Sequence, residues 1–110
     1  MQDDIVQPLI TIIENANSLL GESGLDDGQQ QVVHTILGEA TKLRDLVIAV
    51  SDITMEKVMI VFDFEARQQL ASIIGYTEML LDDSDLLTQR QGRLLETIRR
   101  AGLSLLKAIT

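Results

Sequence analysis

The segment from Phe62 to Leu81 repeats its apolar side chains with helical spacing, and the rest of the chain reads as its partner or its copy. The core-facing positions of this segment are Leu70, Ile73, Ile74, Thr77, Leu80 and Leu81. Residues three and four apart share one face of an α-helix, so this spacing predicts an amphipathic helix with one side turned to a core. The fold must therefore supply helical partners that cover this side.

The same spacing predicts three further helices, over residues 4–20, 28–50 and 89–109, while the first segment continues to residue 82. Turns are expected at residues 21–27 and 82–88. Helix starts are indicated by Asp3 or Asp4, by Asp27 with Gln30, and by Thr88 with Gln91. The chain of 110 residues is 45% apolar and only 3% aromatic, with a single proline. We therefore expect one all-α domain, a four-helix bundle packed by aliphatic side chains.

The two halves of the chain look like copies of each other. Residues 7–13 align with residues 68–74 at an offset of 61, and after one extra residue in the second turn, residues 35–36 align with 97–98. The shared spacing predicts an internal duplication of a helical hairpin. The expected units are a first hairpin over 1–50, a connector over 51–63 and a second hairpin over 64–110.

Two runs in the second half carry a family resemblance. The first matches a helix of the form H-E-x-R-T-P-L followed by I-I-G-Y-x-E-x-L-L, and the second matches L-x-x-x-Q-x-x-x-L-x-x-I-x-x-x-G-x-x-L-L. The matching residues are Glu65, Arg67, Leu70, Ile73, Ile74, Gly75, Tyr76, Glu78, Leu80, Leu81, Gln91, Leu95, Ile98, Gly102, Leu105 and Leu106. This half resembles the dimerisation and histidine-phosphotransfer domain of bacterial sensor histidine kinases. The first half resembles it more weakly and keeps Pro8 and Leu9.

The resemblance implies a fold and a docking surface but not the chemistry of the family. The kinases build a four-helix bundle from two chains, so two hairpins in one chain imply a single-chain pseudo-dimer. The positions of the phosphoaccepting histidine hold Asp3 and Phe64, and the threonine and proline positions hold Gln68 and Gln69. The surface on which receiver domains dock in the family corresponds to Arg67, Ala71, Ile74 and Glu78.

The net charge of −8 is concentrated in the first half, where residues 1–61 carry ten acidic and three basic side chains. Such a surface repels phosphate backbones and anionic lipid, so we expect no nucleic-acid partner. A small basic patch, Arg90, Arg93, Arg99 and Arg100, is expected to be a solvated helix face that pairs with the acidic half. The chain has no cysteine, no apolar run long enough to insert into a membrane and no basic leader, so we expect a cytoplasmic protein.

The connector is apolar on several sides, and its sequence allows either a helical extension or extended chain. The residues in question are Val58, Met59, Ile60, Val61 and Phe62. If they are helical, their surplus apolar surface needs a partner. We therefore expect a homodimer with these residues in the interface.

The only histidine, His34, offers an alternative function. Phosphotransfer needs an exposed imidazole beside an acid, whereas His34 is followed by Thr35 and lies in the second helix of its hairpin. No Gly-rich phosphate loop, metal-ligand spacing or nucleophilic triad is visible, so we expect no catalytic residue, metal or cofactor. The sequence favours a non-catalytic interaction module that binds a kinase or a receiver domain. A phosphotransfer protein using His34 and a structural oligomerisation fragment of a larger sensor are the alternatives.

Overall fold

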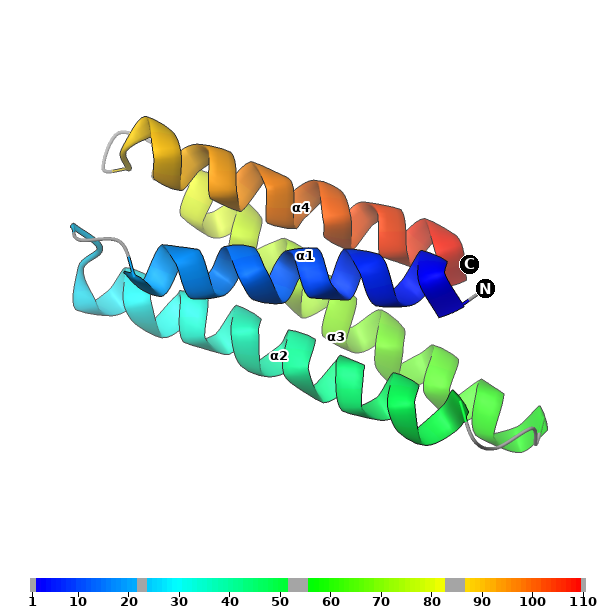
Figure 1. The fold of residues 1–110 in the computed structure, drawn as a ribbon. Coiled ribbons are helices and arrows are strands. Elements are labelled where there is room, and N and C mark those ends of the chain that lie inside the picture. The colour runs from blue at the N-terminus through cyan, green and yellow to red at the C-terminus, as the bar shows by residue number, and fades with distance from the viewer. Residues whose placement is uncertain (1, 22–23, 52–55, 83–86, 110) are drawn as a thin grey trace.

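The computed structural model describes the backbone of residues 2–21, 24–51, 56–82 and 87–109, and the side chains of 6–21, 24–48, 64–82 and 87–108. The chain forms four helices: α1 (Gln2–Gly21), α2 (Asp27–Ser51), α3 (Glu56–Asp82) and α4 (Gln89–Ile109). Over the described residues there is no strand, and the predicted all-α four-helix bundle is confirmed (Figure 1). None of these helices has the length and apolar character needed to cross a membrane.

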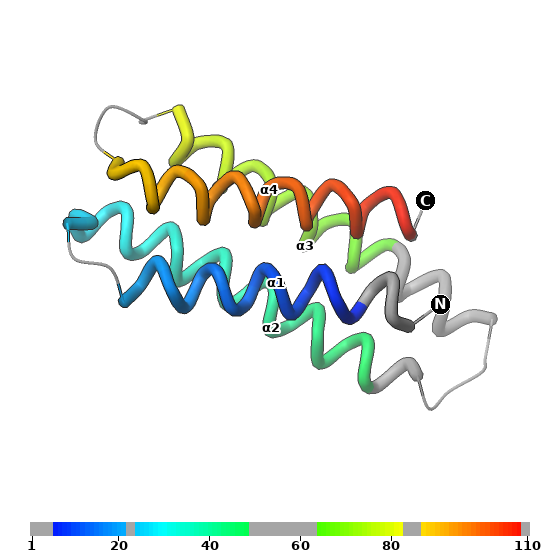
Figure 2. Tube along the Cα trace, turned by 45° about the horizontal axis from the view of Figure 1, so that its top comes forward, coloured from blue at the N-terminus to red at the C-terminus, as the bar shows by residue number. Residues whose placement is uncertain are grey.

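The four helices run along one axis, and each packs against two neighbours. Helix α1 contacts α2 and α4, and α3 likewise contacts α2 and α4. Both chain ends lie at the end of the bundle where α2 passes into α3, opposite the two hairpin turns (Figures 1 and 2). The bundle is elongated, with extents of 46 × 21 × 21 Å. Consequently, each pair of adjacent helices presents one long side to its surroundings.

One aliphatic core runs through the bundle and draws on all four helices. Its largest fully buried side chains are Leu9, Ile12, Leu19, Val33, Ile36, Leu43, Leu70, Ile73, Leu95, Ile98 and Leu105. Within each helix these positions are three or seven residues apart, which is about one or two helical turns. Burial of such a side chain contributes roughly 1.5–3 kcal/mol relative to leaving it in water. The apolar stripe predicted in residues 62–81 is thus the contribution of α3 to a core that all four helices share.

The pattern of burial repeats between the two halves at the offsets found in the sequence. In the first helix of each hairpin the buried pairs are Leu9 and Leu70, Ile12 and Ile73, Ala16 and Thr77, and Leu19 and Leu80. In the second helix they are Gln29 and Gln91, Val33 and Leu95, Ile36 and Ile98, Ala40 and Gly102, and Leu43 and Leu105. We call the members of each pair counterparts. The two hairpins therefore bury their side chains with the same spacing, and their origin by duplication stays a prediction.

The two second helices begin with the same reciprocal hydrogen bonds. At α4, the Gln91 N–H donates to Thr88 Oγ1 over 3.1 Å and the Thr88 N–H donates to Gln91 Oε1 over 2.9 Å, which confirms the predicted capping box. At α2, the Gln29 N–H donates to Asp26 Oδ1 over 2.7 Å and the Asp26 N–H donates to Gln29 Oε1 over 3.0 Å. The two boxes therefore occupy equivalent places in the repeat.

The predicted capping pair of Asp27 and Gln30 was wrong by one residue. Asp27 is the first residue of α2, and the carbonyl of Asp26 accepts the first helical hydrogen bond, from the Gln30 N–H over 2.9 Å. The sequence offers the same D-x-x-Q spacing at both places, and packing decides between them. Gln29 is only 6% exposed and faces the core, whereas Gln30 is exposed.

The start of α1 differs from the sequence prediction, and the start of α3 decides between the two conformations that the sequence allowed for the connector. Helix α1 begins at Gln2, so Asp3 and Asp4 lie in its first turn instead of preceding it as caps. Helix α3 begins at Glu56, so residues 56–63 are helical and not extended. The side chains of Val58, Met59, Ile60, Val61 and Phe62 lie outside the described residues, and their role in a dimer interface stays a prediction.

Counterpart core residues should contribute similarly to stability. Ile12 and Ile73 are both 0% exposed, so replacing either by alanine should lower the free energy of unfolding by about 2–5 kcal/mol. Urea unfolding followed by circular dichroism measures this difference. The exposed Gln31→Ala variant is the control and should change stability by no more than about 0.5 kcal/mol. A cost at one isoleucine several times that at the other would contradict equivalent packing of the two hairpins.

Candidate partner-binding site

The four residues singled out as a docking surface form one stripe along α3. Arg67, Ala71, Ile74 and Glu78 follow one another at intervals of four, three and four residues, which keeps them on one side of the helix. Arg67, Ala71 and Glu78 are exposed, and Ile74 is partly buried. The stripe therefore has a small apolar centre with a positive charge toward one end and a negative charge toward the other.

Ile74 shows that this stripe borders α4. A Cβ atom added to Gly102 of α4 would lie 3.0 Å from Cγ1 of Ile74, closer than such atoms pack. Glycine at this buried position therefore lets the Ile74 side chain lie directly on the α4 backbone. In the other hairpin the counterpart of Gly102 is Ala40, so this close approach is particular to α3 and α4.

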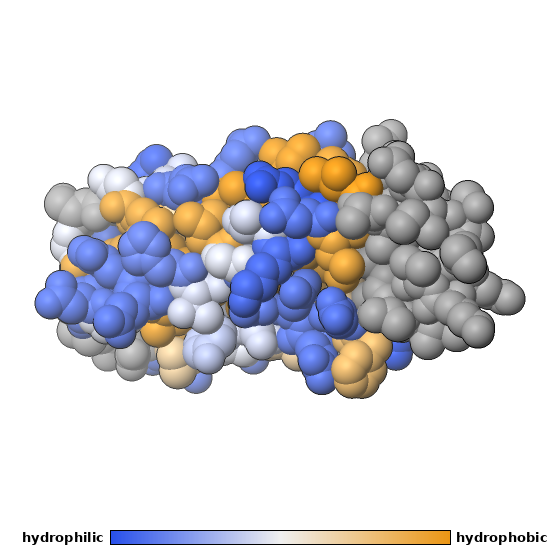
Figure 3. All heavy atoms as spheres, turned by 90° about the horizontal axis from the view of Figure 1, so that it is seen from below, coloured by the Kyte–Doolittle hydropathy of each residue, from blue (hydrophilic) through white to orange (hydrophobic). Residues whose placement is uncertain are grey.

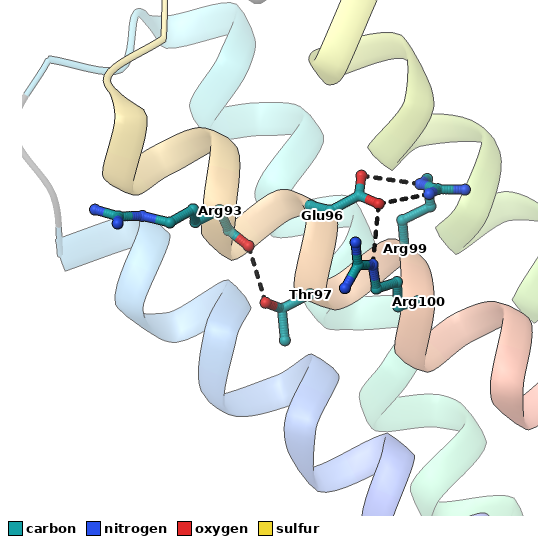
Figure 4. Close-up of polar contacts among 5 residues, drawn as sticks. All are labelled: Arg93, Glu96, Thr97, Arg99 and Arg100. Carbon is teal, nitrogen blue, oxygen red and sulfur yellow. Dashed lines mark hydrogen bonds and ion pairs between the residues drawn. The ribbon is translucent and has the colours of Figure 1, made fainter.

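Beside the stripe, α4 carries a cluster in which one carboxylate holds two guanidinium groups (Figure 4). Arg99 Nε donates to Glu96 Oε2 over 3.0 Å, and Arg100 Nε donates to Glu96 Oε1 over 3.2 Å. The hydrogen bond from Arg99 lowers the pKa of Glu96 below its ordinary value, and Arg100 adds to this shift. Glu96 in turn raises the pKa of Arg99, and the charge of Glu78 on α3 contributes in the same direction.

These contacts correct the expected role of Arg99 and Arg100 in the basic patch. Arg99 and Arg100 make their ion pairs with Glu96 on their own helix and not with the acidic first half. Arg93 lies apart from the cluster, with its side chain pointing away from Glu96, while its carbonyl accepts a hydrogen bond from the Thr97 hydroxyl over 2.9 Å (Figure 4). The spacing of Glu96 three and four residues before the arginines is the signal that sequence reasoning missed.

We define the α3/α4 face as this stripe together with the cluster. Its members are Arg67, Ala71, Ile74 and Glu78 of α3 and Glu96, Arg99 and Arg100 of α4. Apolar contact at its centre and charges of both signs around it suit the recognition of a folded protein surface. The described residues include no group of three or more histidine, aspartate or glutamate side chains that could hold a metal ion.

The positions that correspond to the family's phosphoacceptor lie elsewhere and differ from each other. Phe64 on α3, which the resemblance places at the phosphoacceptor position, is 63% exposed. The side chain of Asp3 lies outside the described residues. His34 is exposed on α2, where it is the counterpart of Glu96, and its neighbours one helical turn away, Gln30, Gln31, Leu37 and Gly38, include no acid.

Two shallow depressions mark the surface of the described residues. One of about 320 Å³ lies between α2 and α3 and is lined by Glu39, Lys42, Phe64, Glu65, Gln68, Gln69 and Ser72. Another, of about 440 Å³, is lined by Gln89, Gly92, Arg93 and Glu96 of α4 and reaches the α3/α4 face. Both are open to solvent, and neither has the enclosed apolar form of a small-molecule site.

Comparison with known protein families, with curated proteins and with solved structures finds no match to this chain. The α3/α4 face is therefore characterised by its geometry alone. That geometry presents charges fixed by hydrogen bonds on α4 and a partly apolar stripe on α3.

The Glu96 cluster should give stability a defined pH dependence. Because the folded protein holds the pKa of Glu96 below its unfolded value of about 4.3, the cluster stabilises the fold above that value and loses its effect as the pH falls through the folded-state pKa. Glu96→Gln should therefore be less stable than the wild type near neutral pH and equal to it in strong acid. Urea unfolding at a series of pH values measures the difference. If Arg99→Gln leaves the pH dependence of the wild type intact, Arg99 is not its cause.

Proposed function

We propose that this chain is a non-catalytic helical interaction module of two-component-type signalling, which binds a kinase or a response-regulator receiver domain on the α3/α4 face. The observation that carries the proposal is the exposed stripe of Arg67, Ala71, Ile74 and Glu78 beside the Glu96 cluster. The resemblance to the kinase dimerisation domain assigns docking to this stripe, and the stripe is accessible in the folded chain.

The residues at the phosphoacceptor positions support a binding role without chemistry. Phenylalanine has no atom that can accept a phosphoryl group, and the ring of Phe64 is exposed where an imidazole would have to be. Glu65 and Arg67 follow Phe64 on the same helix, as the acid and the base follow the histidine in the family motif. The chain thus keeps the acid and the base of the motif but not its nucleophile, and Gln68 and Gln69 replace the threonine and the proline.

Two copies of the chain associate in this proposal, with Val58, Met59, Ile60, Val61 and Phe62 in the interface, and the protein works in the cytoplasm. The helical conformation of residues 56–63 supports the dimer, because a helix cannot turn five consecutive apolar residues to one bundle. A structural oligomerisation fragment of a larger sensor would share this interface but would bind no receiver.

The exposure of His34 favours one alternative, a histidine phosphotransfer protein. An accessible imidazole satisfies the first requirement of that chemistry, but no carboxylate lies one helical turn from it to orient the ring. The two functions differ in whether phosphate is transferred to the chain.

Partner binding should depend on the α3/α4 face. Against a panel of bacterial receiver and kinase dimerisation domains, Ala71→Glu should weaken the wild-type affinity by about tenfold or more, which is ~1.4 kcal/mol, because the new charge occupies the apolar centre. Isothermal titration calorimetry measures the change. Gln68→Glu adds the same charge at an exposed position on α3 facing α2 and is the control. Equal loss in both variants would argue against this face, and binding by no member of the panel would favour a purely structural fragment.

The chain should accept no phosphate. Incubation with a phosphorylated receiver domain, or with ATP and an active sensor kinase, should leave the wild type unlabelled, because the phosphoacceptor position holds Phe64. Radiolabel transfer followed by acid treatment measures this. An acid-labile label that disappears in His34→Ala would establish the phosphotransfer alternative instead.

A further inference from the structure

A close contact lies beneath the α3/α4 face, at a residue that is itself buried. A Cβ atom placed on Gly102 of α4 would lie 3.0 Å from Cγ1 and 3.6 Å from Cδ1 of Ile74 on α3. Carbon atoms that are not bonded to each other pack best at about 3.5–4.0 Å. The Ile74 side chain therefore occupies space that any larger residue at position 102 would need. Among the described residues, the next closest approach to an added glycine Cβ atom is 3.4 Å, at Gly28.

Exposed apolar side chains alone do not single out the α3/α4 face. Helix α4 lies uppermost in Figure 1, and the side of the molecule seen from below carries hydrophobic patches among hydrophilic side chains (Figure 3). What distinguishes the α3/α4 face is that its apolar centre, Ile74, lies on the backbone of the helix that carries the Glu96 cluster. The position of this centre relative to the cluster therefore depends on residue 102.

The Ile74 side chain has little freedom to move aside. Isoleucine is branched at Cβ and strongly prefers one χ1 rotamer in a helix, so Cγ1 keeps a fixed place relative to the α3 backbone. A methyl group at position 102 would therefore push α3 away from α4, and the charged stripe of α3 would move away from the Glu96 cluster. The charge of Glu78 raises the pKa of Arg99 across this gap, so the electrostatics of the face depend on the distance between the two helices.

We propose that Gly102 is a positioning residue, which holds the stripe of α3 at the distance from the Glu96 cluster that partner binding requires. The inference rests on the proposed function and deepens it, because it assigns control of the α3/α4 face to a residue buried beneath that face. In the first hairpin the counterpart of Gly102 is Ala40, which is buried and carries a methyl group. The requirement for glycine is therefore particular to the hairpin that carries the α3/α4 face.

The contact is tested in the free chain by the Gly102→Ala variant, with Gly38→Ala as the matched control. Both replace a glycine inside a helix by alanine, which favours the helix, but no described atom lies within 4 Å of a Cβ atom at Gly38. In urea unfolding, Gly38→Ala should raise the folding equilibrium constant by about fourfold, and Gly102→Ala should raise it less or lower it. In an Ile74→Ala background, where the obstruction is gone, Gly102→Ala should match the control. If Gly102→Ala already matches the control in the wild-type background, the inference is overturned.

Partner affinity separates a positioning role from a purely structural one. In isothermal titration calorimetry against the panel of receiver and kinase dimerisation domains, Gly102→Ala should weaken binding by about fivefold or more, which is ~1 kcal/mol. The Gly38→Ala control should bind like the wild type, and circular dichroism confirms that both variants are folded. Unchanged affinity in a folded Gly102→Ala variant would overturn the inference. Failure of this variant to fold would also overturn it, because glycine would then be needed for the fold and not for the face.

A second measurement keeps the inference separate from the proposed function. If the wild type binds no member of the panel, the proposed function fails, and the backbone amide NMR resonances of Ala71 and Glu78 in the free chain decide the inference. Displacement of α3 should shift both resonances in Gly102→Ala but not in Gly38→Ala. Resonances that stay in place in both variants would overturn the inference.

Discussion

Burial of one aliphatic stripe from each helix is the interaction on which the whole molecule depends. Most of the stability of a helix in a protein comes from packing of its apolar side, so each of these helices of 20 to 27 residues depends on its neighbours to cover that side. Ile12, Ile36, Ile73 and Ile98 are all 0% exposed, one from each helix. The arrangement of the surface follows from this core, because the core fixes which sides of the helices face outward.

Close helix contacts and capping determine how the two hairpins differ within the same plan. The two capping boxes bury Gln29 and Gln91 at equivalent helix starts, where each glutamine satisfies the N–H group of its capping residue. Gly102 then admits Ile74 against the α4 backbone, whereas Ala40 keeps a methyl group at the equivalent place. The two halves of the core therefore follow the same pattern of burial, and the difference between Gly102 and Ala40 lies beneath the α3/α4 face.

The outer surfaces of the two hairpins differ much more than their buried positions do. A symmetric dimer of identical hairpins would have to present two identical faces, and any partner could bind both. A single chain that contains both hairpins is free of this constraint, since each face can change alone. The charged side chains of the α3/α4 face belong to the second hairpin alone, because the counterpart positions of the first hairpin hold Val6, Asn17, His34, Leu37 and Gly38.

Much of this architecture was predictable from the sequence, because helical periodicity is a local property. The spacing of Leu70, Ile73 and Leu80 predicted a buried stripe. The offsets of 61 and 62 predicted which residues of one hairpin would be buried like those of the other. The Thr88 box was also predictable, since only one glutamine there had the right spacing. The family resemblance singled out the stripe of Arg67, Ala71, Ile74 and Glu78. Helical spacing explains why these four residues lie on one side of α3.

Tertiary structure decided what local pattern left open. Gln29 and Gln30 offer the same capping spacing, and only packing against the core selected Gln29. The sequence of residues 56–63 fits either a helix or a strand, and in the folded chain these residues form the beginning of α3. The sequence by itself determined which side of each helix would be buried, because that side follows from residue type and spacing. Only the fold decided which outer sides would adjoin, because Ile74 meets Gly102, and Glu78 approaches Arg99, only when α3 packs on α4.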